Sequence, residues 1–182
     1  MQLNDFYRVI IVGAGPSGLS TALNLIEYGV NDILVIEKSR FPRYKCCAGY
    51  LTSKTKEEYK KAGLDVDGCN YSLIKDFNIV YKNKNRLKIN NKFLYTNRKI
   101  DRVELDNAFY GLAVSKGIAV AENTVITGHD LKSDTLILKD GRRIGYGYLV
   151  FADGTTGFGS RYRKNKKRNI AMQMTFESDR PQ

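Results

Sequence analysis

The strongest constraint in this 182-residue chain is a glycine-rich turn that lies between an apolar strand and an amphipathic helix. Residues 7–12 (YRVIIV) predict a buried parallel strand, and residues 13–18 (GAGPSG) follow at once. Residues 19–28 have helical spacing, and Pro16 is well placed at the helix start. A second buried strand is predicted at 32–37 (DILVIE), so this part of the chain forms a βαβ unit.

The glycine turn and the acid that ends the second strand match the dinucleotide-binding fingerprint. We expect Gly13 to permit the tight turn, Gly15 to let a pyrophosphate approach the backbone, and Gly18 to let helix and strand pack closely. The N–H groups at the helix start would face the phosphates. Glu37 would accept hydrogen bonds from a ribose diol and disfavours a 2′-phosphate. The alternative, a glycine-rich turn with no ligand, is much the weaker interpretation in this strand–turn–helix context.

A loop that contains two adjacent cysteines follows the βαβ unit. It spans residues 38–52 (KSRFPRYKCCAGYLT), and Lys45 precedes Cys46 and Cys47. A cysteine in a reduced protein is commonly a small apolar residue, but a neighbouring lysine can lower the pKa of a thiol. The residues alone favour a structural and a functional role equally. Disulfide-relay chemistry is not expected, since the chain has no C-x-x-C pair.

The rest of the chain predicts an α/β fold with an antiparallel addition. The expected helices are 53–62 and 101–116, and the expected strands are 77–82, 86–89, 93–96, 118–120, 124–127, 135–138 and 148–152. The strand at 118–120 is expected to be the third parallel one, and 124–138 to form an antiparallel meander. Arg102, at the start of a helix, is by itself typical of a solvated charge. Asp153 and Gly154 end a buried strand, where open α/β sheets bind ligands, although Asp-Gly is also common in turns.

Charge and composition exclude several classes of protein. The net charge of +11 comes from residues 82–99 and 161–168, which hold seven and six basic side chains and no acid, and the remainder is slightly acidic. This pattern argues against a nucleic-acid binder, and the basic run at 161–168 is best explained as a solvated face. A single histidine, His129, nearly excludes a multi-histidine metal site, so we expect no metal. No apolar run is long enough to span a bilayer, and three cysteines suit a reducing cytoplasm.

Taken in order, these segments resemble the FAD-dependent oxidoreductases of the geranylgeranyl reductase family. The resemblance is carried by GAGPSG at 13–18 with Glu37, FPRYKCCAGYLT at 41–52, DRVELDNAFYGLAVSKGIAV at 101–120 and KDGRRIGYGYLVFADG at 139–154. The Lys-x-Cys-small-Gly part of the second segment is the most specific. The resemblance implies a Rossmann-type FAD-binding domain with an antiparallel meander and the start of a second antiparallel substrate sheet.

The same resemblance implies a flavin-dependent reductase of isoprenoid carbon–carbon double bonds, with NAD(P)H or ferredoxin as electron donor and a small-molecule or prenyl-lipid substrate. A flavin monooxygenase and a truncated, non-catalytic FAD-binding fragment are the alternatives. If the substrate is a prenyl lipid, the basic run at 161–168 would give weak attraction to an anionic membrane surface. We then expect a cytoplasmic protein that is peripheral to the membrane.

The resemblance also implies which residues bind FAD and which one acts beside the flavin. Cys47 is the candidate catalytic residue beside the flavin, and we assign it to proton delivery as a hypothesis. The cofactor-binding residues implied are Gly13, Gly15, Pro16, Ser17, Gly18, Glu37, Lys38, Cys47, Ala48, Gly49, Arg102, Val125, Asp153 and Gly154.

The chain departs from the family pattern in three places. Tyr50 stands where these reductases commonly have glycine, and residues 155–159 lengthen the spacing after the Asp-Gly pair. A third FAD motif, expected later in such chains, is absent. We therefore expect an FAD-binding domain at 1–72 and 100–165, partial substrate-domain strands at 73–99 and 166–182, and a missing carboxyl-terminal half or a complementing chain.

Overall fold

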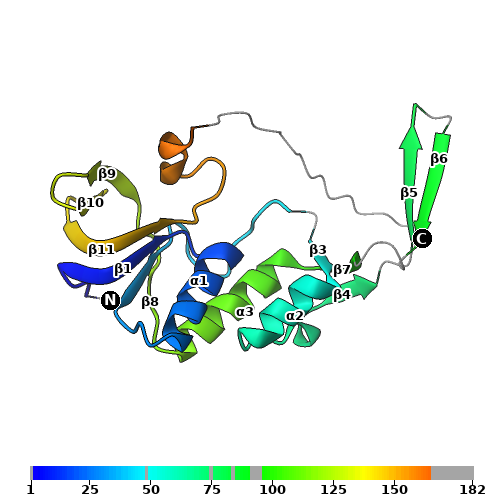
Figure 1. The fold of residues 1–182 in the computed structure, drawn as a ribbon, viewed down its shortest axis with the longest axis horizontal. Coiled ribbons are helices and arrows are strands. Elements are labelled where there is room, and N and C mark those ends of the chain that lie inside the picture. The colour runs from blue at the N-terminus through cyan, green and yellow to red at the C-terminus, as the bar shows by residue number, and fades with distance from the viewer. Residues whose placement is uncertain (1, 48, 74–75, 83–84, 91–95, 165–182) are drawn as a thin grey trace.

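The computed structural model describes residues 2–47, 49–73, 76–82, 85–90 and 96–164. Its main element is a six-stranded sheet in the order β8-β2-β1-β11-β10-β9 (Figure 1). The strands are β1 (Phe6–Val12), β2 (Ile33–Ile36), β8 (Ala119–Ala121), β9 (Ile126–Asp130), β10 (Thr135–Leu138) and β11 (Arg143–Phe151). β1 pairs in parallel with both β2 and β11, and β2 pairs in parallel with β8. The predicted α/β class and the third parallel strand are confirmed.

The last strand of this sheet begins earlier than the sequence suggests. We expected it at 148–152, but β11 covers Arg143–Phe151 because it has two partners. Its first residues, 143–145, pair antiparallel with β10, and residues 145–151 pair in parallel with β1. β10 in turn pairs antiparallel with β9, so the predicted meander is confirmed.

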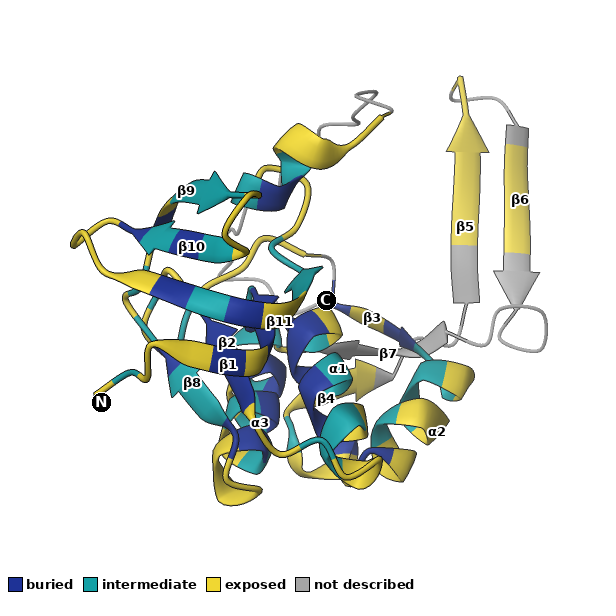
Figure 2. Ribbon diagram, turned by 60° about the vertical axis from the view of Figure 1, so that its left-hand side comes forward, coloured by how far each residue is buried: buried dark blue, intermediate teal, exposed yellow. Residues whose placement is uncertain are grey.

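Both faces of the parallel strands are buried, which explains their uninterrupted apolar sequences. One face packs against α1 (Pro16–Glu27) and α3 (Arg102–Ser115), where Leu19 and Phe109 are fully buried. The other face is covered by the meander, with Ile10 and Leu136 among its buried residues. Figure 2 shows buried residues in dark blue on β1, β2, β11 and the two helices. The site described below lies at the carboxyl ends of these strands.

A second, three-stranded sheet has the order β3-β7-β4, formed by β3 (Tyr50–Thr52), β7 (Thr96–Ile100) and β4 (Tyr71–Leu73). The expectation that 38–52 is entirely loop is therefore wrong at its end, because Tyr50–Thr52 pairs with β7. The strand expected at 93–96 is displaced to 96–100, and residues 93–95 lie outside the described part of the chain. α2 (Ser53–Lys61) begins where the Thr52 hydroxyl accepts a hydrogen bond from the Thr55 N–H, and η1 (Val66–Gly68) is one short turn.

A two-stranded hairpin of β5 (Asp76–Tyr81) and β6 (Asn85–Asn90) lies apart from the two sheets in Figures 1 and 2. It confirms the strands expected at 77–82 and 86–89. Ile79, Val80 and Leu87 are exposed on it, and an isolated hairpin needs further packing to be stable. Its assignment to a substrate domain together with 166–182 stays a prediction, since 166–182 lies outside the described residues.

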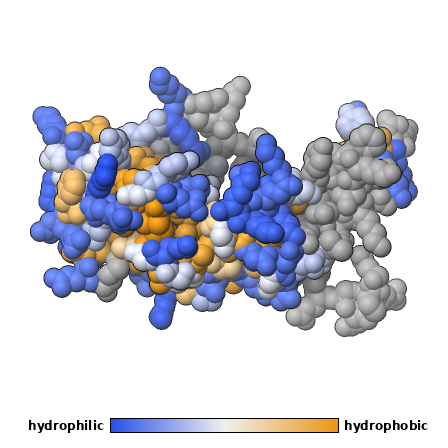
Figure 3. All heavy atoms as spheres, turned by 60° about the horizontal axis from the view of Figure 1, so that its bottom comes forward, coloured by the Kyte–Doolittle hydropathy of each residue, from blue (hydrophilic) through white to orange (hydrophobic). Residues whose placement is uncertain are grey.

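The surface over the helices carries both apolar and hydrophilic side chains. Figure 3 shows this side of the molecule, where an apolar area lies between hydrophilic side chains. Within the described residues, no helix has both the length and the apolar character that crossing a membrane requires.

Candidate cofactor site

The glycine turn between β1 and α1 has the conformation that the fingerprint requires. Gly13 has a φ of +102°, a region that favours glycine, and its N–H donates to the Ile36 carbonyl at 2.7 Å. A Cβ on Gly18 would lie 1.9 Å from the Gly13 carbonyl oxygen, so only glycine lets the helix start this close to the turn. Gly15 precedes α1 and makes no side-chain cap, which leaves the first N–H groups of the helix for a ligand.

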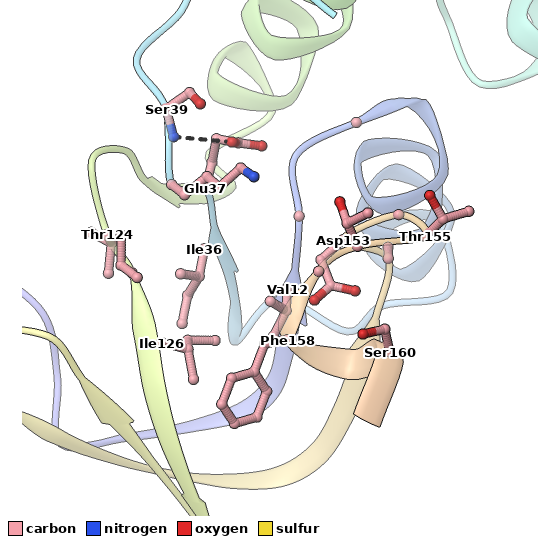
Figure 4. Close-up of a pocket in the computed structure, with 18 of the residues that line it drawn as sticks. Val12, Ile36, Glu37, Ser39, Thr124, Ile126, Asp153, Thr155, Phe158 and Ser160 are labelled. Atoms are coloured by element: carbon pink, nitrogen blue, oxygen red, sulfur yellow. Dashed lines mark hydrogen bonds between the residues drawn. The ribbon is translucent and has the colours of Figure 1, made fainter. Parts of the chain in front are cut away.

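The turn opens onto a cavity of about 640 Å³ at the carboxyl ends of β1, β2 and β11 (Figure 4). The loops after these strands and the start of β9 form its walls. The predicted residues that line it are Gly13, Gly15, Glu37, Lys38, Val125, Asp153 and Gly154. Pro16, Ser17 and Gly18 lie at the beginning of α1, next to this lining.

Glu37 is buried at the end of β2, with 5% of its surface exposed. Its two carboxylate oxygens accept hydrogen bonds from the Ala14 N–H and the Ser39 N–H, each at 3.0 Å. These bonds fix the carboxylate, and Oε1 keeps a second lone pair for a ribose hydroxyl. The Arg43 guanidinium lies 3.4 Å from the same carboxylate.

Arg43 and Lys45 add positive charge to the cavity, and the sequence analysis did not assign them to it. The Lys45 Nζ lies 3.3 Å from the position that a Cβ on Gly15 would take, so an ammonium faces the glycine turn. The Arg43 Nε is buried and has no hydrogen-bond partner among the described residues. Together these residues fit the adenosine and pyrophosphate parts of FAD. The glycines of the turn, which have no side chains, and the Lys45 ammonium suit the pyrophosphate, and the fixed Glu37 carboxylate suits the ribose. The Arg43 Nε adds a hydrogen-bond donor that is unsatisfied within the described part of the chain.

A buried ion network leads from the cavity to the cysteine loop. Arg43 Nη1 contacts Asp106 Oδ2 at 3.2 Å, and Arg102 Nη2 contacts Asp106 Oδ1 at 2.6 Å. Asp106, on α3, is completely buried and lies between the two guanidiniums. Arg102 is therefore held inside the protein and is not the solvated charge that its sequence position alone suggests.

Cys47 lies at the far end of this network. Partial burial raises the pKa of its thiol, but the Gly49 backbone N–H, the Arg102 guanidinium and Lys45 together lower the pKa below its ordinary value. Cys47, Gly49 and Arg102 thus form a cluster beside the cavity, although they are not among the residues that line it. Ala48 lies outside the described residues.

We expect Cys47 to react with iodoacetamide at lower pH than Cys69 does. Burial raises the pKa of Cys69, and nearby Glu104 and Asp65 raise it further. The thiolate is the form that reacts with iodoacetamide. Because the pKa of Cys47 is lowered and that of Cys69 is raised, Cys47 has the larger thiolate fraction of the two at the same pH. Alkylation rates of both cysteines, measured by peptide mass spectrometry across a pH series, test this. Identical pH profiles would contradict it.

The segment after Asp153-Gly154 forms one wall of the cavity, which sequence reasoning missed. Asp153 accepts a hydrogen bond from the Gly159 N–H at 2.8 Å and so fixes η2 (Phe158–Tyr162). The lining residues of this wall are Thr155, Thr156, Gly157, Phe158, Ser160 and Arg161. Their signal in the sequence was the lengthened spacing after the Asp-Gly pair.

The family described as FAD binding domain matches residues 7–178 of the chain. An uncharacterised protein of Methanosarcina barkeri is 34% identical over 158 residues, covering 85% of this chain and 39% of that protein. A menaquinone reductase of Mycolicibacterium smegmatis is 28% identical over 165 residues, covering 84% of this chain and 38% of the reductase. The chain therefore spans less than half the length of these relatives.

A solved structure supports the fold. PqsL of Pseudomonas aeruginosa, in complex with 2-aminobenzoylacetate, superposes with a TM-score of 0.72 at 20% identity. The similarity covers 91% of this chain and 48% of PqsL. At this level of identity the likeness concerns the architecture alone.

Proposed function

We propose that this chain, which belongs to the FAD binding domain family, is part of a flavin-dependent reductase of isoprenoid carbon–carbon double bonds. The chain is an FAD-binding oxidoreductase by its family. The proposal adds the substrate, an isoprenoid, and the direction of the reaction, which is reduction of the double bond. Similarity to a menaquinone reductase supports it, since menaquinone is an isoprenoid quinone.

The observation that carries the reductase proposal is the Cys47 thiol held by Arg102 and the Gly49 N–H. Cys47 and Gly49 of this cluster belong to the Lys-x-Cys-small-Gly segment through which the chain resembles the geranylgeranyl reductases, and Arg102 is the first residue of α3. The cluster is linked to the cavity through Asp106 and Arg43, and the proposal requires the flavin ring to lie on that side, where a proton donor for the double bond is needed. A plain nucleotide-binding site has no need of such a thiol.

Bound FAD, once reduced by the electron donor, would supply the hydride for the double bond. The glycine turn, the start of α1 and Lys45 would hold its pyrophosphate, and Glu37 its ribose. The Cys47 Sγ would pass its proton to the carbon that does not receive the hydride. Arg102 and the Gly49 N–H would stabilise the thiolate left behind, and water would return the proton.

The proposal extends to the partners of the whole protein. Electrons would come from NAD(P)H or ferredoxin, and the substrate would be a prenyl lipid. The two basic segments would give weak attraction to an anionic membrane surface from the cytoplasm.

Product formation by Cys47→Ala and Cys46→Ala variants tests the proposal. The full-length protein that contains this chain is loaded with FAD, reduced without oxygen and mixed with menaquinone or a geranylgeranyl lipid. The wild-type protein should yield a product two hydrogens heavier by mass spectrometry. Fragmentation should locate both hydrogens on the isoprenoid chain, because reduction of a quinone ring to the quinol would add the same mass. Cys47→Ala should slow product formation by about 100-fold, the lower range for loss of a general acid, while Cys46→Ala, its matched control, should not.

Two results would count against the reductase. Equal rates for the two variants would remove Cys47 from proton delivery. Oxygen consumption with hydroxylation of an aromatic compound, and no reduction of the isoprenoid, would instead assign the chain to the flavin monooxygenases.

A further inference from the structure

The segment 155–162, which departs from the family spacing, is built as a fixed wall of the cavity. Asp153 holds it through the Gly159 N–H, and Arg163 Nη2 donates to the Gly154 carbonyl at 3.0 Å. The Tyr162 hydroxyl hydrogen-bonds His129 Nδ1 at 2.7 Å, and the Tyr162 ring stacks on Phe151 with centroids 5.3 Å apart. These contacts fix the wall within the fold.

The wall is also tightly packed at its glycines. A Cβ on Gly157 would lie 2.1 Å from the Asp153 carboxyl carbon, and one on Gly159 would lie 2.6 Å from the Phe151 side chain. These close approaches bring the backbone against Asp153 and the end of β11. Phe158, the residue between the two glycines, lines the cavity. Figure 4 shows Phe158 reaching toward Val12 and Ile126.

Two side chains of this wall form a pair. The Arg161 guanidinium carbon lies 3.7 Å from the centre of the Phe158 ring, within the range of a cation–π contact. Phe158 packs against the apolar cluster that contains Ile36 and Ile126, and both Phe158 and Arg161 line the cavity.

The cavity therefore has a polar end and an apolar end. Gly15 and Lys45 give one end backbone and positive charge, which suit a pyrophosphate, and Glu37 lies where a ribose would follow. Ile36, Ile126 and Phe158 give the other end apolar surface. A flat purine base suits such a surface, because aromatic rings stack well on one another and beneath a guanidinium.

We propose that Phe158 and Arg161 bind the adenine of FAD, so that segment 155–162 makes the site selective for adenine nucleotides. The inference rests on the FAD site described above and adds residues that the fingerprint does not include. It predicts that the chain recognises ADP, which lacks the flavin, through the same two side chains. FMN, which lacks the adenine, would not depend on them.

Binding of FAD, ADP and FMN by Phe158→Leu and Arg161→Gln tests the proposal. FAD affinity is measured by quenching of flavin fluorescence, ADP by competition with FAD, and FMN directly. Phe158→Leu should weaken FAD and ADP about tenfold, as for loss of a base-stacking ring. Arg161→Gln should weaken both about threefold, as for an exposed cation–π contact, and FMN should bind unchanged. Arg142→Gln, an exposed arginine paired with Asp140, is the control.

The outcomes separate this proposal from the function above. Wild-type affinity for ADP in both variants would overturn it, as would failure of the unaltered chain to bind ADP. A parallel loss of FMN affinity would show a general disturbance of the fold and would overturn it too. Because Phe158 is partly buried, thermal unfolding of both variants is compared, and Arg161→Gln keeps the test independent of packing. Failure of isoprenoid reduction would leave these results unchanged.

Discussion

Replacing Gly18 with alanine should prevent FAD binding and lower the stability of the chain. The added Cβ would lie 1.9 Å from the Gly13 carbonyl oxygen and 3.1 Å from its carbon. Both are backbone atoms of the turn, so no side chain can rotate away, and α1 must shift from β1. Overpacking of this kind costs about 1–3 kcal/mol, and we expect the upper end. The same shift would withdraw the helix start from the pyrophosphate.

Gly111→Ala is the matched control for this prediction. Gly111 lies in α3, and a Cβ there meets no atom within 4 Å. An alanine in a helix interior should raise stability by up to about 1 kcal/mol. Chemical denaturation of both variants measures the difference, and flavin fluorescence measures FAD binding. A Gly18→Ala protein with wild-type stability and FAD affinity would show that the close packing of α1 on the turn is not required.

The sequence predicted the glycine turn and Glu37 because their signals are local. Each lies in one βαβ segment, where the order of strand, turn and helix fixes the geometry. Asp106 could not be predicted in this way, since its partner Arg43 is 63 residues away and the pair forms only when α3 packs beside the cysteine loop. Its sequence position, one turn after Arg102 on a helix, resembles that of an ordinary surface ion pair.

The wall at 155–162 was missed for a different reason. In the sequence, the segment differs from a simple turn only by the longer spacing after the Asp153-Gly154 pair. That spacing indicated an irregular segment but did not predict its structure. Phe158 lies in the cavity because Gly157 and Gly159 allow the backbone to approach Asp153 and Phe151 closely. Such an approach depends on the tertiary fold and leaves no periodic pattern in the sequence.

The second large effect is expected at Asp106. Asp106→Ala would leave the guanidiniums of Arg43 and Arg102 without their shared carboxylate, and their side chains are only 11% and 13% exposed. Breaking a buried ion pair by removing one partner costs about 3–5 kcal/mol, because a charge stays buried without compensation. Arg43 would also lose the contact that holds it beside Glu37, so FAD affinity should fall together with stability.

Two further variants distinguish charge from packing at this position. Asp106→Asn keeps the size and one carbonyl acceptor but removes the negative charge, so it should fall between wild type and Asp106→Ala in chemical denaturation. Asp140→Ala removes an exposed partner of Arg142 and should change stability little, since solvent already screens that pair. If Asp106→Ala lost no more stability than Asp140→Ala, the network from Glu37 to Cys47 would be held by packing of the loop and α3. The charged groups of this network would then lower the pKa of Cys47 without stabilising the fold.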